Sequence, residues 1–184
     1  ITGHAIEARI CAENPESNFL PATGTMDTLR WPAHVAFSRN ADGEPAHDAA
    51  AVRVDAGVRE GDPISPYYDS MIAKLIVWGE TRAQALARLD AALAETHIVG
   101  LHTNVAFLRR VVASRSFATA ELDTALIERE AAVLFKQPPL ALEIAAAGVA
   151  AHALADEQRL QDSDPWSRRD GFRLHGGAVR HFDI

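Results

Sequence analysis

The stretch GHAIEARICAENP, residues 3–15, decides how the first part of this chain folds. Every second residue from His4 to Ile10 belongs to a mostly apolar face, whereas Glu7 and Arg9 fall on the opposite face. Alternation with a period of two is typical of a β-strand that rests on a core, and Asn14-Pro15 is a signal for its end. The pattern therefore predicts a strand that displays a carboxylate and a guanidinium side by side on its outer surface.

Arg9 is the first candidate functional residue. A guanidinium that projects from a strand, beside an acid that fixes its direction, is suited to binding a planar oxyanion. The alternative is an ordinary surface ion pair of little energetic value, and the pattern alone favours that alternative. Cys11 lies on the same face, but no histidine adjoins it in the sequence. A structural thiol is therefore favoured over a nucleophile.

Composition excludes several classes of function. The 184 residues are 48% hydrophobic with a net charge of −7, and the calculated pI is about 5.6. This acidity argues against a nucleic-acid partner, and scattered basic residues without a long apolar run argue against a membrane partner. The single cysteine fits a reducing compartment, and the dispersed histidines predict no metal site. Because the chain begins with Ile1 rather than methionine, we expect it to be a piece of a longer polypeptide.

The remaining patterns indicate more strands, followed by helices. Alternation predicts a strand at residues 51–58, and a continuous apolar run predicts a strand at 72–78 that is buried on both faces. Thr81 and Gln84 form a capping box that opens an amphipathic helix ending near Glu95. Short extended segments are expected at 25–32 and 97–100, a second helix after a cap at Thr103 or Asn104, and a third helical stretch from 119 or 124 to 135. The predicted fold class is α+β, an antiparallel sheet with helices packed on one side.

A boundary is expected at Pro138-Pro139, because two prolines in a row cannot continue a helix. It separates a first domain, residues 1–136, from a second segment, residues 137–184. That second segment has one helical stripe between Leu140 and Leu154 and two short strands around Gly176-Gly177. A helix and one hairpin cannot cover their own apolar surface, so the second domain is expected to be truncated.

Three long strings carry a resemblance to a known family. GHAIEARICAENP at 3–15, FLPATG at 19–24 and YYDSMIAKL at 67–75 resemble, in order and spacing, the C-terminal part of the biotin carboxylase family. The resemblance covers residues 1 to about 135. It implies the fold of a biotin carboxylase C-terminal domain.

In that family, ATP and bicarbonate form carboxyphosphate, and CO2 released from it reacts with the ureido nitrogen of biotin. The resemblance implies that Arg9 stabilises negative charge on the biotin ureido oxygen. Glu7 is assigned as the residue that orients Arg9, from strand geometry alone. Biotin is expected on a domain outside this chain, and the ATP and Mg sites largely outside it, so this piece alone is expected to be inactive.

The resemblance also points to an interface. The segment around Asp69 lies at or near the homodimer contact in the family, and Arg53 occupies the position of an interface arginine. A second biotin carboxylase domain is therefore an expected partner. An ordinary solvated strand face, on which charges block unwanted pairing, is the alternative for both residues.

The later part of the chain resembles a subfamily. Residues 101–110 and 164–173 look like the alpha subunit of 3-methylcrotonyl-CoA carboxylase, in which a helix wrapped by a β-barrel docks a carboxyltransferase beta subunit. Acetyl/propionyl-CoA and geranyl-CoA carboxylase alpha subunits are the alternatives, as are a similar carboxylase acting on pyruvate or urea and a non-catalytic dimerisation or docking module. The expected location is the cytoplasm of a bacterium or the mitochondrial matrix of a eukaryote.

Overall fold

The computed structural model describes residues 2–36, 51–67, 69–136, 139–161 and 164. The chain divides into two compact units, residues 1–136 and 137–184. The assignment of these segments to two domains stays a prediction. Each unit is considered by itself.

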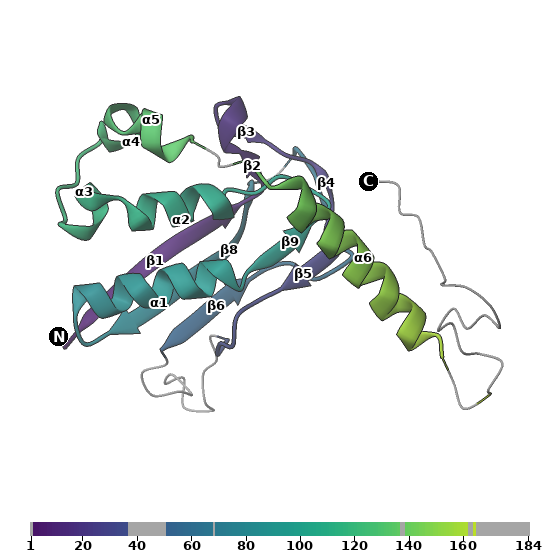
Figure 1. The fold of residues 1–184 in the computed structure, drawn as a ribbon. Coiled ribbons are helices and arrows are strands. Elements are labelled where there is room, and N and C mark those ends of the chain that lie inside the picture. The colour runs from purple at the N-terminus through teal and green to yellow at the C-terminus, as the bar shows by residue number, and fades with distance from the viewer. Residues whose placement is uncertain (1, 37–50, 68, 137–138, 162–163, 165–184) are drawn as a thin grey trace. The chain divides into compact units, whose positions relative to one another are not determined.

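A three-stranded antiparallel sheet is the centre of the first unit (Figure 1). Its strands are β1 (His4–Cys11), β8 (Met71–Gly79) and β6 (Val52–Ala56), in the order β1-β8-β6. Three two-stranded antiparallel ladders surround it. They are formed by β2 (Glu13–Asn14) with β3 (Leu20–Pro21), β4 (Gly24–Thr25) with β7 (Pro63–Ile64), and β5 (Thr28–Arg30) with β9 (His97–Val99).

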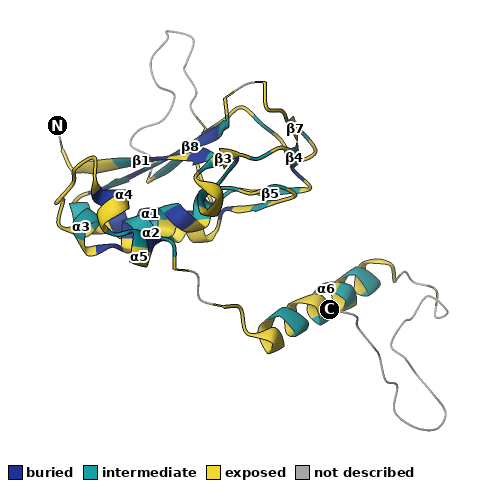
Figure 2. Ribbon diagram, turned by 90° about the horizontal axis from the view of Figure 1, so that it is seen from above, coloured by how far each residue is buried: buried dark blue, intermediate teal, exposed yellow. Residues whose placement is uncertain are grey.

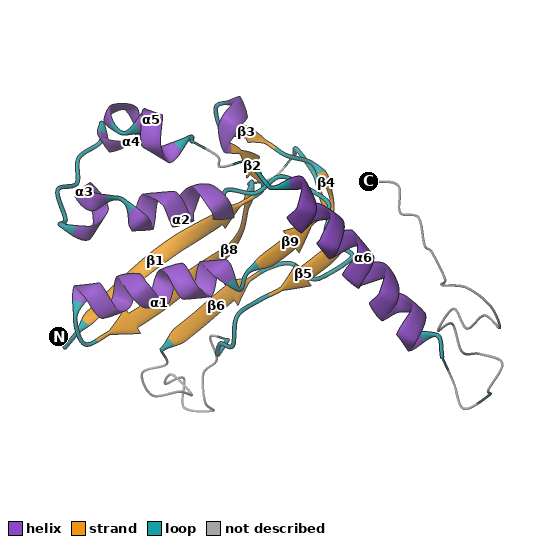
Figure 3. Cartoon of the chain, in the orientation of Figure 1, coloured by secondary structure: helices purple, strands orange, loops and turns teal. Residues whose placement is uncertain are grey.

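Helices cover one face of this sheet (Figures 2 and 3). Helix α1 (Arg82–Ala94) packs against β8 and β1, and α2 (Val105–Ala113) packs against α1. The short helices are η1 (Pro15–Ser17), α3 (Arg115–Ala118), α4 (Leu126–Arg129) and α5 (Ala131–Leu134). The predicted α+β class, an antiparallel sheet with helices on one side, is confirmed.

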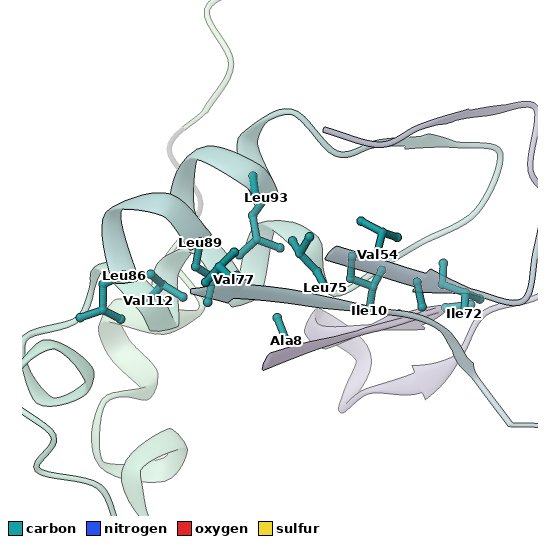
Figure 4. Close-up of a cluster of buried hydrophobic side chains, with 13 residues drawn as sticks. Ala8, Ile10, Val54, Ile72, Leu75, Val77, Leu86, Leu89, Leu93 and Val112 are labelled. Atoms are coloured by element: carbon teal, nitrogen blue, oxygen red, sulfur yellow. The ribbon is translucent and has the colours of Figure 1, made fainter. Parts of the chain in front are cut away.

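The core lies between the sheet and α1. Its side chains come from alternate positions of the strands, which turn one face inward, and from the inner stripe of the helix. Ile10 on β1, Leu75 and Val77 on β8, and Leu89 and Leu93 on α1 are almost completely buried (Figure 4). The periodicities that predict these elements therefore also identify their buried residues.

Three local predictions need correction. Strand β8 is buried on one face, and Lys74, Ile76 and Trp78 are half-buried on the other, because the helices cover a single side of the sheet. The third helical stretch, expected from 119 or 124 to 135, is divided into α4 and α5, and α3 lies before it. Thr81 caps α1 as predicted by accepting from the N–H of Gln84, but the Gln84 side chain accepts from the N–H of Glu80 instead of Thr81.

In the second unit, the structure describes one long helix, α6 (Leu142–Arg159), where the apolar stripe predicts a helix. None of its residues is buried, and Leu142, Ile144 and Leu154 are exposed. The strands predicted around Gly176-Gly177 lie outside the described residues. No described helix is both long and apolar enough to cross a bilayer.

Candidate functional site

Arg9 and Glu7 lie on the face of β1 that is turned away from the helices. Strand alternation buries Ala8 and Ile10 and leaves both charged side chains outside. The Arg9 side chain is 68% exposed and the Glu7 side chain 40% exposed, and Arg9 Nε lies 3.6 Å from Glu7 Oε1. The predicted pair therefore exists as an open surface ion pair. Its geometry leaves most of the guanidinium available to another group.

Strand register places further charges on the same face. Arg9 is opposite Lys74 of β8, which is opposite Asp55 of β6, so these three residues form one row across the sheet. Glu7 is likewise opposite Ile76, which is opposite Arg53. Since neighbouring strands are about 4.8 Å apart, Arg9 and Asp55 are separated by roughly 10 Å at the backbone. We call these two rows, residues 7, 9, 53, 55, 74 and 76, the outer face.

Arg53 and Asp69, the two predicted interface residues, make different contacts. Arg53 Nη2 donates to Asp55 Oδ2 at 3.0 Å on the outer face. Asp69 is exposed in the turn before β8, where its Oδ1 accepts from the N–H of Met71 at 3.0 Å. A cavity of about 490 Å³ is lined in part by Asp55, Asp69 and Lys74. The end of the outer face and the turn that contains Asp69 therefore line the same cavity.

Cys11 follows Arg9 on the same side of the strand and is a free thiol of intermediate exposure. Burial raises the pKa of the Cys11 thiol above its ordinary value of 9.0, and the Glu13 and Asp69 carboxylates raise it further. A hydrogen bond with Ser70 and the positive charge of Arg9 oppose this shift. The thiol is therefore protonated at neutral pH, which suits a structural role better than a nucleophilic one.

Alkylation tests this protonation state. Because the thiolate is the reactive form, iodoacetamide is expected to modify Cys11 more slowly in the native protein than in urea at pH 8. The native rate should rise with pH through a midpoint above 9.0. The pKa of the Cys11 thiol is then higher in the folded protein than in the unfolded chain. The contribution of the protonated thiol to the free energy of unfolding is therefore complete below pH 9 and declines as the pH rises through the folded pKa. A native midpoint below 9.0 would contradict the assignment.

Asn104 is a residue of this region whose contacts the sequence does not reveal. Its side chain accepts from the N–H of Cys11 at 2.9 Å and donates to the carbonyl of Arg9 at 3.0 Å. Its own N–H donates to the carbonyl of Cys11 at 3.2 Å. Asn104 occupies the N-cap position of α2 but makes no side-chain capping bond. The sequence signal, an asparagine before a helix, predicts the cap position and not these contacts.

A second contact connects the end of β1 to the Asp69 turn. Ser70 Oγ donates to Glu13 Oε1 at 2.5 Å, and the N–H of Ala12 donates to the carbonyl of Ser70 at 2.7 Å. These bonds link two of the strings that carry the sequence resemblance. Within the described ranges, no group of three or more His, Cys, Asp or Glu side chains is arranged to hold a metal ion.

Comparison with known proteins gives a consistent result. The family model described as the biotin carboxylase C-terminal domain matches residues 7–129. The chain is 40% identical over 181 residues to the mitochondrial methylcrotonoyl-CoA carboxylase subunit alpha of Dictyostelium discoideum, covering 95% of this chain and 24% of that protein. It is 37% identical over 183 residues to the propionyl-CoA carboxylase alpha chain of Ruegeria pomeroyi, covering 93% of this chain and 27% of that protein.

Among solved structures, the chain resembles the biotin carboxylase domain dimer of the Hydrogenobacter thermophilus 2-oxoglutarate carboxylase, in complex with MgADP, ADP and bicarbonate. The TM-score is 0.64 at 30% identity, and the match covers 75% of this chain and 27% of that chain. The chain thus spans about a quarter of the length of the relatives named here.

Proposed function

This chain belongs to the biotin carboxylase C-terminal domain family, and from that premise we propose that it completes the catalytic domain of a biotin-dependent carboxylase, in which Arg9 acts on biotin. The observation that supports this role most directly is the direction of Arg9. Its guanidinium stands on the outer face, 68% exposed and held by Glu7 at 3.6 Å. A guanidinium in this setting is available to a substrate oxygen supplied from outside the chain.

The chemistry of the reaction accounts for an arginine at this place. When bound, biotin would supply a ureido nitrogen that takes up the carboxyl group, and Arg9 would face the oxygen of that ureido group, where negative charge would develop. Arg9 presents several N–H donors in one plane, an arrangement that suits hydrogen bonds to an oxyanion. A fixed cation that meets developing charge in a water-poor site lowers the barrier by several kcal/mol. Glu7 keeps the guanidinium turned along the strand.

ATP and Mg²⁺ are assigned largely to polypeptide outside this chain. The part of the chain that the structure describes has no cluster of metal ligands, so no step that involves Mg²⁺ is assigned to its residues. What this chain contributes is the outer face of the sheet, which would form one wall of a site completed by other domains. The biotin itself would be carried by a further domain, as expected from the sequence.

We assign the chain to an acyl-CoA carboxylase alpha subunit, and among these to 3-methylcrotonyl-CoA carboxylase. The 40% identity to the Dictyostelium subunit over almost the whole chain supports this assignment. Helix α6 would begin the segment that docks a carboxyltransferase beta subunit, because its exposed leucines and isoleucine need a covering surface. The proposed location is the cytoplasm in a bacterium or the mitochondrial matrix in a eukaryote.

Arg53 and Asp69 are proposed to face a second biotin carboxylase domain. The Arg53–Asp55 ion pair is half-exposed, and Asp69 borders the cavity at the end of the outer face. A twofold partner that buries this region would remove the Arg53–Asp55 ion pair from water, where the attraction between its two charges is stronger.

The proposed function is tested in the full-length enzyme by ATP-dependent carboxylation of free biotin with labelled bicarbonate. Arg9→Ala is expected to lose this activity while it keeps its fold and its oligomeric state. Arg109→Ala is the matched control, because Arg109 is an exposed arginine paired with Asp90 at 2.9 Å between α1 and α2. Undiminished carboxylation by Arg9→Ala would favour the alternative function, a non-catalytic dimerisation or docking module.

A further inference from the structure

We propose that Asn104 is a positioning residue that fixes the strand backbone from which Arg9 projects. This inference rests on the proposed function of Arg9 and extends it to a residue on another element. Asn104 does not contact the Arg9 side chain. It acts on the main chain on both sides of Ile10, at the place where the strand departs from regular pairing.

Strand β1 needs such support for two reasons. It lies at one end of the order β1-β8-β6, so its outer backbone groups have no neighbouring strand within the described sheet. Its register with β8 also shifts between Ile10 and Cys11, directly after Arg9. An irregularity of this kind disrupts the ladder and re-aims nearby side chains, and it recurs next to active sites. The direction of the Arg9 side chain therefore depends on what holds the backbone there.

Asn104 supplies the missing partners. The Asn104 side-chain nitrogen donates to the Arg9 carbonyl at 3.0 Å. Its side-chain oxygen accepts from the Cys11 N–H at 2.9 Å, and its backbone N–H donates to the Cys11 carbonyl at 3.2 Å. One residue thus takes the place of a neighbouring strand across the irregular position. Since Asn104 is 8% exposed, water cannot readily replace these bonds.

The choice of residue agrees with this role. An asparagine at an N-cap usually accepts a hydrogen bond from its own helix, but the Asn104 side chain makes none there. Its amide nitrogen donates to β1, and its amide oxygen accepts from β1. Among side chains of this size, an amide is the one that offers both functions in a fixed plane, whereas an ionised aspartate accepts and does not donate.

The test uses full-length enzyme and compares kcat for biotin carboxylation. Asn104→Ala is expected to lower kcat by about 10-fold to 100-fold, because a displacement of a reacting group by about 1 Å has a cost of this order. KM for ATP should stay within about 2-fold, since Arg9 is not assigned to nucleotide binding. Asn104→Asp, which keeps the acceptor for Cys11 but loses the donor to Arg9, is expected to lose kcat as well.

Thr96→Val is the matched control. Thr96 is also buried, and its hydroxyl donates to the carbonyl of Ala92 at 2.8 Å within one helical turn. Thr96→Val is expected to lower thermal stability as Asn104→Ala does, while kcat is retained.

A double variant tests whether Asn104 acts through Arg9. If it does, Asn104→Ala must lower kcat by less when Arg9 is already changed, because coupled residues are non-additive. In an Arg9→Lys background, Asn104→Ala is therefore expected to lower kcat by less than about 3-fold.

The outcomes separate the two hypotheses. If Arg9→Ala lowers carboxylation but folded Asn104→Ala and Asn104→Asp keep the parental kcat, the inference about Asn104 is overturned and the function stands. An undiminished Asn104 effect in the Arg9→Lys background also overturns it, because the two residues would then act independently. If Arg9→Ala itself keeps full activity, the proposed function fails, whatever Asn104 does.

Discussion

Replacement of Arg9 by alanine is expected to lower kcat for carboxylation of free biotin by about 10²-fold to 10³-fold. This is the loss found when one preorganised donor to a developing oxyanion is removed, and it corresponds to roughly 3–4 kcal/mol of transition-state stabilisation. Stability should hardly change, since Arg9 is 68% exposed and its ion pair with Glu7 is long. The measurement is the steady-state rate with saturating ATP and bicarbonate, together with a thermal unfolding curve.

Arg9→Lys is expected to retain an intermediate rate. Lysine keeps the charge, but its single ammonium on a flexible stem cannot reproduce the planar donor arrangement of a guanidinium. Arg109→Ala should keep the parental kcat. If Arg9→Ala and Arg109→Ala gave the same small decrease, the effect would be one of general surface charge and the catalytic assignment would be wrong.

The largest effect on stability is expected for Leu75→Ala. Leu75 is completely buried on the central strand β8, in the cluster that joins the sheet to α1. Removal of its side-chain atoms leaves a cavity that a strand with neighbours on both sides cannot close. The expected loss is about 2–5 kcal/mol in the free energy of unfolding, measured by urea denaturation of the 184-residue chain.

Leu122→Ala is the matched control for Leu75→Ala, because it removes the same atoms from a side chain that is about half-exposed. Its unfolding midpoint should stay close to that of the parental chain. A Leu75→Ala protein that unfolds at the same urea concentration as Leu122→Ala would show that the sheet–helix core described here is not what stabilises the first unit.

Period-two alternation was sufficient to predict β1 and β6, and the Thr81 capping signal was sufficient to place the start of α1. The capping contact is local, between Thr81 and Gln84. The alternation of a strand is visible in the sequence, although β1 and β6 pair with the distant strand β8. The family strings add a role for Arg9, which the alternation alone does not indicate. Membership of the family is confirmed by the match over residues 7–129. The role of Arg9 stays a prediction.

Contacts between distant parts of the chain could not be predicted in this way. Asn104 bonds to Cys11 across 93 residues, and Ser70 bonds to Glu13 across 57, so neither pair has a local sequence signal. The apolar run at 72–78 predicts a strand buried on both faces, and this prediction is wrong for a related reason. The run indicates only that the strand is apolar. How many of its faces are buried depends on where the helices pack, and this packing involves residues distant in sequence.

The most direct test of the central claim, that the Arg9 guanidinium acts on biotin, is chemical rescue of the full-length Arg9→Ala enzyme with free guanidinium. The account predicts a rate of biotin carboxylation about 10²-fold to 10³-fold below the parental rate, which rises saturably when guanidinium ion is added at concentrations that leave the parental enzyme unaffected. A parental rate from Arg9→Ala without any added guanidinium would contradict it.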